Sequence, residues 1–297
     1  MAISIVRRAH KAGRLLICDP GHFCQKVYSL VRSLYPLSKY PVRKKVSGVT
    51  FEFNFSYDPV IKHMYCGEYE EETVAVMRKF LHKGDTFVDI GANIGYLSTV
   101  AAGIVGVTGR VYSFEPVPGH FARLKNIAAL NQEYNITVNQ CALGAEDGSA
   151  KIAVTNLANI GWNTIVPGFM SQDTIKESID VPVSRFDNFV SKYSLTNISL
   201  IKIDTEGYEF PVLKGFSGFF EKTKDRPVIL CEVAPEAYPY LGYTVDQLFD
   251  YMRRYGYEAF HIFDVSARVN PALLRTTTNV VFIPNRGTHE AQWSRAK

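Results

Sequence analysis

Hydrophobic and polar positions follow two patterns along the chain, and the two patterns alternate between residues 85 and 255. Short apolar runs predict buried strands, whereas apolar positions three or four residues apart predict helices. The strands predicted in this way occupy residues 87–90, 110–114, 136–143, 200–203 and 228–231. The predicted helices occupy residues 96–104, 118–130, 188–193, 209–216 and 245–255. Such an alternation predicts an α/β fold in which a mostly parallel sheet carries helices on both faces.

Several stretches lie outside this regular alternation. Residues 49–57 alternate apolar and polar side chains and predict a strand, while residues 70–82 predict a helix. Residues 144–185 form a long insert that contains Gly and Asn, and residues 259–263 and 280–283 could form a closing hairpin. In a sheet of this kind, ligands bind at the carboxyl ends of the strands. Side chains that follow the predicted strands are therefore the first candidates for a functional site.

Charge separates the N-terminal part of the chain from the remainder. Residues 1–45 hold ten Lys or Arg residues against one acid, Asp19, and carry a charge of +9. Because the whole chain carries +4, residues 46–297 carry −5. Apolar positions near the start gather on one face of a helix with basic positions opposite. We therefore predict two parts, a basic helical N-terminal arm at residues 1–45 and a domain at residues 46–297.

The basic arm predicts an anionic partner, which would be an anionic membrane surface or an acidic protein. The alternative is a helix that packs on the acidic body of the same chain. In a eukaryotic host, the Arg-rich residues 1–20 also resemble a mitochondrial presequence. The mild charge of the whole chain predicts no nucleic-acid partner.

The cysteine pattern and the apolar runs bear on location. There are five cysteines and no CxxC spacing, so neither a disulfide framework nor a zinc site is predicted. Cys141 and Cys231 lie in apolar runs and are expected to be buried. No apolar run reaches the roughly 18 residues of a membrane-spanning helix, and basic residues interrupt every candidate signal segment. We expect a cytoplasmic protein, with peripheral membrane attachment as a variant.

The most informative string is Phe87-Val-Asp-Ile-Gly-Ala-Asn-Ile-Gly95, a buried strand that runs into a turn and a helix. Gly91 and Gly95 allow the backbone to approach a ligand or a neighbouring element closely. Asp89 ends the strand where its carboxylate could reach a cationic ligand. The string departs from the dinucleotide fingerprint, because Asn93 replaces the middle glycine and Tyr96 the last. A purely structural turn is the alternative.

The second string, Val111-Tyr-Ser-Phe-Glu-Pro116, places an acid at the end of the next strand. Glu115 lies 24 residues after Gly91. This is close to the offset at which a carboxylate binds the two hydroxyls of a ribose. The two strings together predict a cofactor that contains adenosine.

The third string, Leu200-Ile-Lys-Ile-Asp-Thr-Glu-Gly-Tyr-Glu209, places Asp204 and Glu206 after a strand at the same sheet edge. Lys202 interrupts that strand and is expected to form an ion pair with one of these acids. A helix cap or turn is the structural alternative for Asp204. His261 lies in a late strand and is expected in the core, with catalysis as the lesser alternative.

The three strings, in this order and followed by Val212-Leu-Lys-Gly215, resemble the FkbM family of S-adenosylmethionine-dependent methyltransferases. The resemblance covers about residues 65–285. It implies a class I methyltransferase fold, which is Rossmann-like and doubly wound, with a mostly parallel seven-stranded sheet that contains one antiparallel strand. It also implies that S-adenosylmethionine is the cofactor, bound by Asp89, Gly91, Asn93, Gly95 and Glu115, with adenine near Ala142 and Leu143.

The FkbM resemblance implies methyl transfer to a hydroxyl of a carbohydrate, lipid-linked or secondary-metabolite acceptor. Such a hydroxyl must lose its proton, and a positioned base accelerates that step by about 10²–10⁴-fold. We assign this role to Asp204, with Glu206 as its helper. Together with Glu232 the two acids could instead hold a divalent cation, although the favoured prediction contains no metal.

Other functions and other substrate contacts remain as alternatives. These functions are N-methylation of an amine, a catalytically silent scaffold of the same fold and, less favoured because of Asn93, an NAD-dependent oxidoreductase. Loops are expected to contact the acceptor. The candidates are Trp162, Asn163 and Phe169 of a lid within residues 156–172, and a sugar-binding surface of Tyr238, Tyr240 and Tyr243. Simple packing is the alternative for the tryptophan and the tyrosines.

Overall fold

The computed structural model describes residues 41–55, 60–155 and 162–285 of the 297-residue chain. The chain divides into two compact units, and nearly all described residues belong to the unit of residues 43–53 and 57–297. The expected helical arm falls mainly on residues 1–40, which lie outside the described residues, so its partner stays a prediction. The last residues assigned to the arm form most of strand β1 (Val42–Val46).

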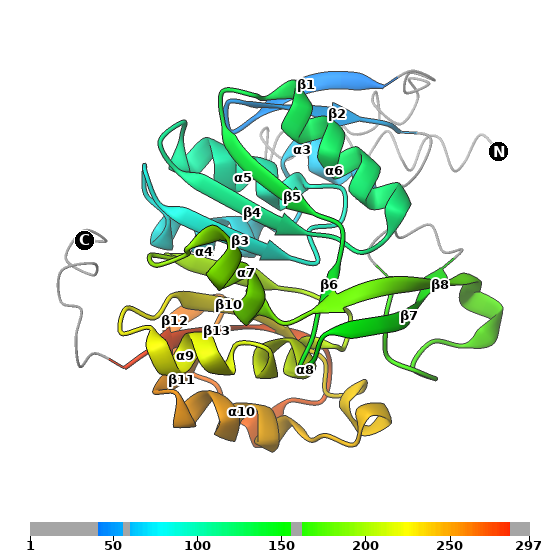
Figure 1. Cartoon of the computed structure of the whole chain (residues 1–297), viewed down its shortest axis with the longest axis vertical. Helices are drawn as coiled ribbons and strands as arrows, with labels where there is room; N and C mark the ends of the chain where they lie inside the picture. The colour runs from blue at the N-terminus through cyan, green and yellow to red at the C-terminus, as the bar shows by residue number, and fades with distance from the viewer. Residues whose placement is uncertain (1–40, 56–59, 156–161, 286–297) are drawn as a thin grey trace, which may run out of the picture. The chain divides into compact units, whose positions relative to one another are not determined.

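An eight-stranded sheet forms the centre of this larger unit, in the order β12-β11-β13-β10-β9-β3-β4-β5 (Figure 1). Strands β5, β4, β3, β9 and β10 are parallel, and β13 is antiparallel to both β10 and β11. The seven strands from β5 to β11 form the mostly parallel seven-stranded sheet that the resemblance implies, with β13 as the one antiparallel strand. Their bounds are β3 (Thr86–Ile90), β4 (Arg110–Phe114), β5 (Asn135–Asn139), β9 (Leu200–Ile203), β10 (Val228–Val233), β11 (Tyr257–His261) and β13 (Thr278–Pro284).

The eighth strand, β12 (Asp264–Arg268), extends the sheet at its edge by pairing antiparallel with β11. Its alternate residues are exposed, so it lacks the buried apolar run that predicts the central strands. The two segments expected to form a closing hairpin do pair antiparallel, with Ala259 opposite Phe282. They are not consecutive strands, because β12 lies between them in the chain.

Helices lie on both faces of the sheet, as the alternation predicts (Figure 1). Those packed into the largest core are α7 (Phe186–Tyr193), α8 (Glu209–Lys214), α9 (Ser217–Lys222) and α10 (Val245–Arg254). This core meets the sheet through side chains such as Val88, Ile201 and Ile229. The helices of the opposite face are α4 (Glu71–Phe80), α5 (Tyr96–Val105) and α6 (Pro118–Leu130). The central parallel strands β3, β9 and β10 are thus buried on both sides, which explains their apolar patterns.

The insert of residues 144–185 contains regular structure rather than one long loop. Strand β7 (Gly148–Thr155) and strand β8 (Ile175–Ser184) form an antiparallel pair, and the short β6 (Ala142–Leu143) joins β8 in parallel. The predicted strand at residues 136–143 is therefore split between β5 and β6. A small core beneath this sheet contains Val117, Ile152 and Val181.

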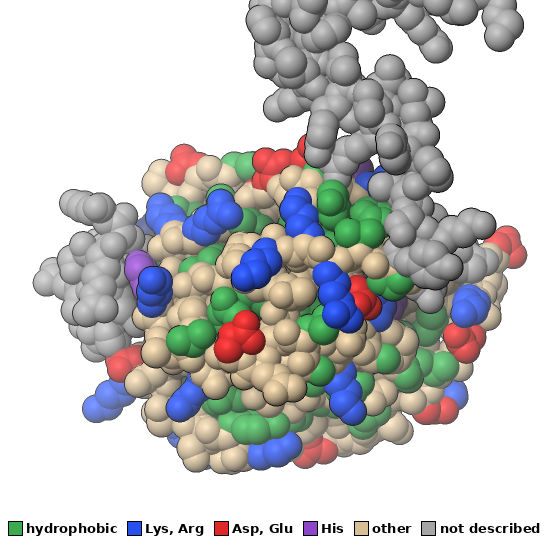
Figure 2. Space-filling model, turned by 90° about the horizontal axis from the view of Figure 1, so that it is seen from above, with side chains coloured by type: hydrophobic (Ala, Val, Ile, Leu, Met, Phe, Trp, Pro, Cys, Tyr) green, Lys and Arg blue, Asp and Glu red, His purple; other side chains and the backbone are tan. Residues whose placement is uncertain are grey.

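Strand β1 forms a two-stranded sheet with β2 (Val49–Phe53), the strand expected at residues 49–57. Asn131, after α6, anchors β2 by accepting a hydrogen bond from Thr50 N and donating one to Thr50 O, each 2.8 Å. The short helix α3 (Val60–Cys66), which the sequence pattern did not reveal, follows. Figure 2 shows Lys and Arg side chains spread over the face of the molecule seen from above. No described helix is long and apolar enough to cross a bilayer.

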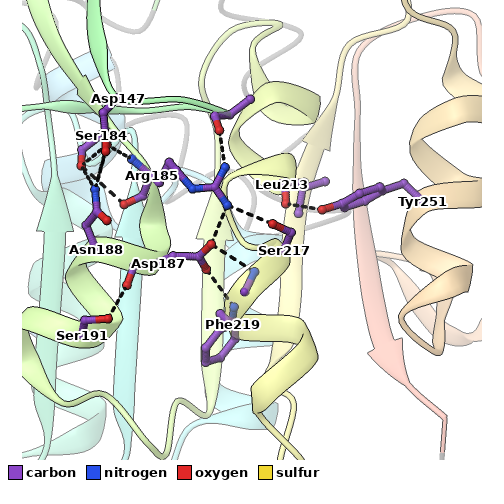
Figure 3. Close-up of polar contacts among 12 residues, drawn as sticks. Asp147, Ser184, Arg185, Asp187, Asn188, Ser191, Leu213, Ser217, Phe219 and Tyr251 are labelled. Atoms are coloured by element: carbon purple, nitrogen blue, oxygen red, sulfur yellow. Dashed lines mark hydrogen bonds and ion pairs between the residues drawn. The ribbon is translucent and has the colours of Figure 1, made fainter.

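A paired charge network joins the turn before α7 to α9 (Figure 3). Arg185 Nη2 donates to Asp187 Oδ2 at 2.6 Å and to Ser217 Oγ at 2.9 Å, and Nη1 donates to the Ala145 carbonyl. Asp187 also accepts from the backbone N–H groups of Gly218 and Phe219 at the start of α9, at 3.0 and 2.8 Å. Each charge therefore has a partner of opposite sign or a backbone dipole, which suits a structural junction.

Candidate functional site

A cavity opens at the carboxyl ends of β3, β4, β9 and β10, where the three sequence strings end. Residues that follow these strands line it, among them Asp89, Glu115 and Asp204. Because parallel strands end at one sheet edge, segments more than 100 residues apart in the chain meet here.

Gly91 brings the first and third strings into backbone contact. Its φ is +80°, and a Cβ atom at this position would lie 1.7 Å from the Asp204 carbonyl oxygen. Asp204 N donates to Ile90 O at 3.0 Å, while Gly91 N and Ala92 N donate to Phe114 O at 3.0 and 2.9 Å. Glycine is therefore required at residue 91, both for its conformation and for the close approach.

Asp89 presents an unsatisfied carboxylate oxygen to this region. Its side chain is 1% exposed, and Oδ2 accepts a hydrogen bond of 2.6 Å from Ser98 Oγ. Oδ1 is buried and has no hydrogen-bond partner in the part of the chain that the structure describes. Burial raises the pKa of Asp89 to about 6, although Lys202 and the Ser98 hydroxyl oppose the rise. A cationic ligand group would satisfy this oxygen.

Glu115 joins the first string to the second. Its Oε2 accepts from Asn93 N at 2.9 Å and its Oε1 from Val117 N at 2.8 Å. Burial raises the pKa of Glu115 to about 7, and these two backbone hydrogen bonds oppose the rise. A carboxylate has about four acceptor positions, so Glu115 can still accept hydrogen bonds from hydroxyls in the cavity.

The other expected cofactor residues differ in position. Asn93, in the left-handed conformation with φ of 51°, lines the cavity together with Ala142 and Leu143. Gly95 does not belong to the lining. It precedes α5, and a Cβ atom there would lie 2.7 Å from Leu124 Cδ1 of α6. Its role in this structure is the close packing of two helices.

Three carboxyl groups converge at the carboxyl ends of β9 and β10. Oxygen atoms of Asp204, Glu206 and Glu232 lie within 4.8 Å of one another, close enough to hold a metal ion. Lys202 Nζ donates to Asp204 Oδ2 at 2.7 Å, which confirms the expected ion pair. Burial alone would lower the pKa of Lys202, but the carboxylates, with Asp204 foremost, raise it overall. The buried ammonium group of Lys202 therefore interacts electrostatically with several carboxylates.

Crowding affects the two glutamates of this cluster most. Burial raises the pKa of Glu206 and of Glu232, and the nearby carboxylate of Asp204 raises both further. Glu232 Oε2 is buried and lacks a hydrogen-bond partner among the described residues. Glu206 holds a strained left-handed backbone with φ of 52°, a conformation that accumulates at functional sites.

The turn that carries Glu206 is organised by Glu209, not by Asp204. Glu209 Oε1 accepts from Thr205 N and Thr205 Oγ1, both at 3.1 Å, and from Gly207 N at 2.8 Å. The cap or turn role that was the alternative for Asp204 therefore belongs to Glu209. Thr164 of the insert adds a hydrogen bond of 2.6 Å from its hydroxyl to Glu206 O. The sequence indicated neither partner, although Glu209 stands in the first turn of a predicted helix.

Glu70 and Tyr69 are lining residues that the sequence analysis did not single out. Glu70 precedes α4 with a left-handed φ of 48°, and its buried Oε2 has no hydrogen-bond partner within the described ranges. Burial, followed by the charge of Glu70, raises the pKa of Tyr69. Acidic residues at the start of a helix usually lie on the solvated surface, and Glu70 is followed by Glu71 and Glu72. The sequence signal that could have revealed the site is the aromatic residue Tyr69 directly before these acids.

The loop residues separate into two groups. Trp162, 44% exposed, and Asn163 line the cavity, whereas Phe169 packs on Tyr240 with ring centroids 6.0 Å apart. Tyr238 is fully buried and donates to Glu209 Oε2 at 3.3 Å, so its place in a sugar-binding surface was wrongly expected.

Three further expectations concern residues away from the cavity lining. Tyr243 packs against Phe210, with ring centroids 5.0 Å apart, and Tyr240 is exposed outside the lining. His261 is exposed at the end of β11, so its expected place in the core is also wrong. Cys141 and Cys231 are buried as expected.

The strand order and the three converging strings define the class of this protein as a class I methyltransferase fold with its cavity at the expected strand ends. The family model described as the methyltransferase FkbM domain matches residues 89–259, which is more than half of the chain. The chain therefore belongs to the FkbM methyltransferase family, and the sequence resemblance is confirmed.

The individual relatives share low sequence identity with this chain. Methyltransferase 1 of Beauveria bassiana (strain ARSEF 2860) is 27% identical over 167 residues, which cover 50% of this chain and 66% of that protein. The crystal structure of an FkbM methyltransferase from Methylobacillus flagellatus KT is 20% identical, covers 69% of this chain and 48% of its own, and gives a TM-score of 0.40. Aeropyrum pernix fibrillarin with natively bound S-adenosyl-L-methionine is 12% identical, with 84% and 85% coverage and a TM-score of 0.44.

Proposed function

We propose that this protein transfers a methyl group from S-adenosylmethionine to a hydroxyl of a carbohydrate, lipid-linked or secondary-metabolite acceptor. The observation that carries the proposal is the composition of one cavity. It contains an unsatisfied buried oxygen of Asp89, the carboxylate of Glu115 at the next strand end, and the carboxyl cluster at Asp204. The first two suit an adenosine-containing cation, and the third suits removal of a proton. Membership of a methyltransferase family supports the same reaction.

The residues present fit the cofactor. Asp89 Oδ1 and Glu70 Oε2 are buried acceptors without partners among the described residues, and each would take an N–H donor of the cofactor's ammonium group. Glu115 would accept the ribose hydroxyls, while Ala142 and Leu143 would contact the adenine. The bound cofactor supplies a methyl group on a positively charged sulfur, which is already activated for transfer. The protein must mainly align the acceptor with that methyl group.

Asp204 is the residue we propose to accept the proton of the acceptor hydroxyl. It follows β9 directly, lines the cavity and is held at one carboxylate oxygen by Lys202. This ion pair orients the carboxylate and balances its charge. Glu206, whose pKa is raised by burial and by Asp204, can as a carboxylic acid donate a hydrogen bond to the acceptor. Trp162 at the same cavity offers a partly exposed ring for packing against the acceptor.

A metal-assisted reaction is the second candidate, because Asp204, Glu206 and Glu232 lie close enough together to bind a divalent cation. Lys202 competes with such an ion for Asp204. The competition favours the role of Asp204 as a base over its role as a ligand.

The test is transfer of a labelled methyl group into fractionated host extract, preceded by calorimetric measurement of S-adenosylmethionine binding. Asp204→Asn should lower single-turnover transfer by about 10²–10⁴-fold and leave cofactor affinity almost unchanged. Chelator should leave the wild-type rate unchanged if Asp204 is a base and should reproduce the variant's loss if it is a metal ligand. Near-normal transfer by the folded variant would contradict the assignment, and a protein that does not bind the cofactor would contradict the proposed function.

A further inference from the structure

The ionisable side chains that line the cavity are mostly acidic. Its carboxyl side chains come from several different strands and turns: Glu70, Asp89, Glu115, Asp204, Glu206 and Glu232. The basic side chains of the described lining are Lys202 and His120. Lys202 is 3% exposed and bound to Asp204. Burial, and then the charge of Arg123, lowers the pKa of His120 to about 4, so its ring is neutral at neutral pH.

Two short sequence segments that directly precede lining residues contain no basic side chain. Residues 56–59 precede the lining residue Val60, and residues 156–161 precede Trp162. Neither segment contains Lys, Arg or His, and the first contains an acid, Asp58. Basic side chains are plentiful on the outer face drawn in Figure 2. Residues 46–297 carry a charge of −5, and six of their carboxyl groups line this one cavity.

The cofactor would balance only part of this acid excess. The ammonium group of S-adenosylmethionine would meet the acids near its own end, Asp89 and Glu70, and because the cofactor's carboxylate offsets its sulfonium, the whole cofactor adds one net positive charge. Lys202 balances Asp204. Glu206 and Glu232 then remain at the acceptor end without a basic partner in the described lining. Burial and the carboxylate of Asp204 raise the pKa of both glutamates, which shows that another negative charge nearby is already unfavourable.

We propose that the acceptor is neutral or positively charged around its reacting hydroxyl, and that acceptors with a phosphate or carboxylate at that place are rejected. The inference rests on the proposed function and adds the charge class of the substrate. An anionic group would lose its water shell beside these carboxyl groups, and no free basic side chain of the described lining could replace that shell. A polyhydroxylated neutral acceptor would instead donate hydrogen bonds to Glu206 and Glu232. The hydroxyl would thus be methylated in the absence of a neighbouring phosphate, whether before phosphorylation or after transfer from a nucleotide carrier.

The experiment uses the full chain, labelled S-adenosylmethionine and host extract separated by ion exchange into neutral, cationic and anionic fractions. We expect at least about tenfold more label in the neutral or cationic fraction than in the anionic one, the factor that corresponds to one unfavourable charge contact of about 1.4 kcal/mol. A portion of the anionic fraction is treated with phosphatase before the reaction. Treatment should create acceptors and increase its label.

A matched pair of variants assigns the selection to the cavity. Glu232→Lys places a cation among the carboxyl groups of the cavity, so the ratio of anionic to neutral label should rise by about tenfold. Glu258→Lys makes the same substitution at a residue that pairs with Arg268 outside the cavity, and its ratio should match the wild type. Label mainly in the anionic fraction, and lost after phosphatase, would overturn the inference while leaving methyl transfer intact. Absence of label from every fraction would contradict the proposed function, and this inference with it.

Discussion

Two clusters of charged side chains in this protein are built on opposite principles. Around Arg185, the guanidinium and the Asp187 carboxylate bind each other and also bind backbone groups of neighbouring segments (Figure 3). In the cavity, Lys202 is the one described lysine among several acids, and oxygens of Asp89 and Glu232 are buried without partners within the described ranges. Both clusters join segments that are distant in sequence.

The difference distinguishes a structural junction from a binding site. Buried polar groups stabilise a fold only when they are satisfied, and unsatisfied ones cost about 1–3 kcal/mol each. The Arg185 cluster meets that condition by itself. The acids of the cavity are satisfied only when a ligand supplies the missing hydrogen-bond donors. Ligand binding would therefore regain the free energy that these unsatisfied groups cost the folded protein. Stability and function are thus held in separate polar clusters of one domain.

The largest expected effect comes from disrupting the backbone contact that assembles the cavity. Gly91→Ala places a Cβ atom against the Asp204 carbonyl and forces a left-handed conformation on alanine. We expect a loss of at least about 3 kcal/mol in the free energy of unfolding, measured by urea denaturation. Gly119→Ala is the matched control, because nothing lies within 4 Å of its added Cβ, and it should change stability by less than about 1 kcal/mol. Similar stabilities for the two variants would refute the close approach.

Breaking the satisfied cluster should cost somewhat less. Arg185→Met leaves Asp187 and the Ala145 carbonyl without their shared donor, and we expect a loss of about 2–3 kcal/mol in urea denaturation. Arg268→Met removes the exposed pair with Glu258 and should cost at most about 1 kcal/mol. Cofactor affinity should be unchanged in both variants. An effect of Arg185→Met on affinity larger than on stability would argue against separate clusters.

Glu115 tests the cofactor end of the cavity. Glu115→Ala should weaken S-adenosylmethionine binding by about tenfold or more, because hydrogen bonds to a charged group are worth about 1.5–3 kcal/mol. The substitution also frees Asn93 N and Val117 N, so calorimetry is combined with a melting curve. Glu133→Ala, at an exposed acid after α6, serves as the control. Unchanged affinity in a folded Glu115 variant would remove this residue from the cofactor site.

The smallest expected effect has the opposite sign to the others. Burial holds the pKa of Asp89 at about 6, above its value of 3.8 in an unfolded chain. The folded protein therefore binds this proton more tightly than the unfolded chain, and its stability falls as the pH rises from about 4 to about 6. Asp89→Asn should stabilise the cofactor-free protein at pH 7 by about 1–2 kcal/mol and weaken cofactor binding. The gain should vanish near pH 4 in urea denaturation, and a variant less stable than the wild type at pH 7 would contradict the reasoning.

Much of the site could be inferred before the structure because its residues directly follow strands. Asp89, Glu115 and Asp204 each come at the end of an apolar run, and these strand ends meet at one sheet edge. Gly95 shows the limit of that reasoning. It belongs to the same string as Gly91, yet one glycine faces a strand turn and the other faces a helix. Local sequence cannot separate the two roles, because the neighbour that requires the glycine lies elsewhere in the chain.

The residues that sequence analysis missed share one property. Glu70, Thr164 and Glu209 act through contacts with segments that their own neighbours in the sequence do not indicate. Tyr238 shows the converse, because it lies in a Tyr-Pro loop that resembles a surface, yet it is fully buried and donates a hydrogen bond to Glu209. Whether a polar side chain finds a hydrogen-bond partner depends on which segments pack together. The apolar periodicity of one segment does not predict that packing.

The sequence by itself determined the alternation of strands and helices and the class of fold, because apolar periodicity is a local property that each segment carries within itself. It also determined that three acids end three strands of one sheet. Only the tertiary structure decided which acids are satisfied. Asp187 received a guanidinium and two backbone donors, whereas Asp89 was left with one free oxygen. These two aspartates differ in role because partners supplied by distant segments, rather than residue type, decide whether a carboxylate stabilises the fold or is left for a ligand to satisfy.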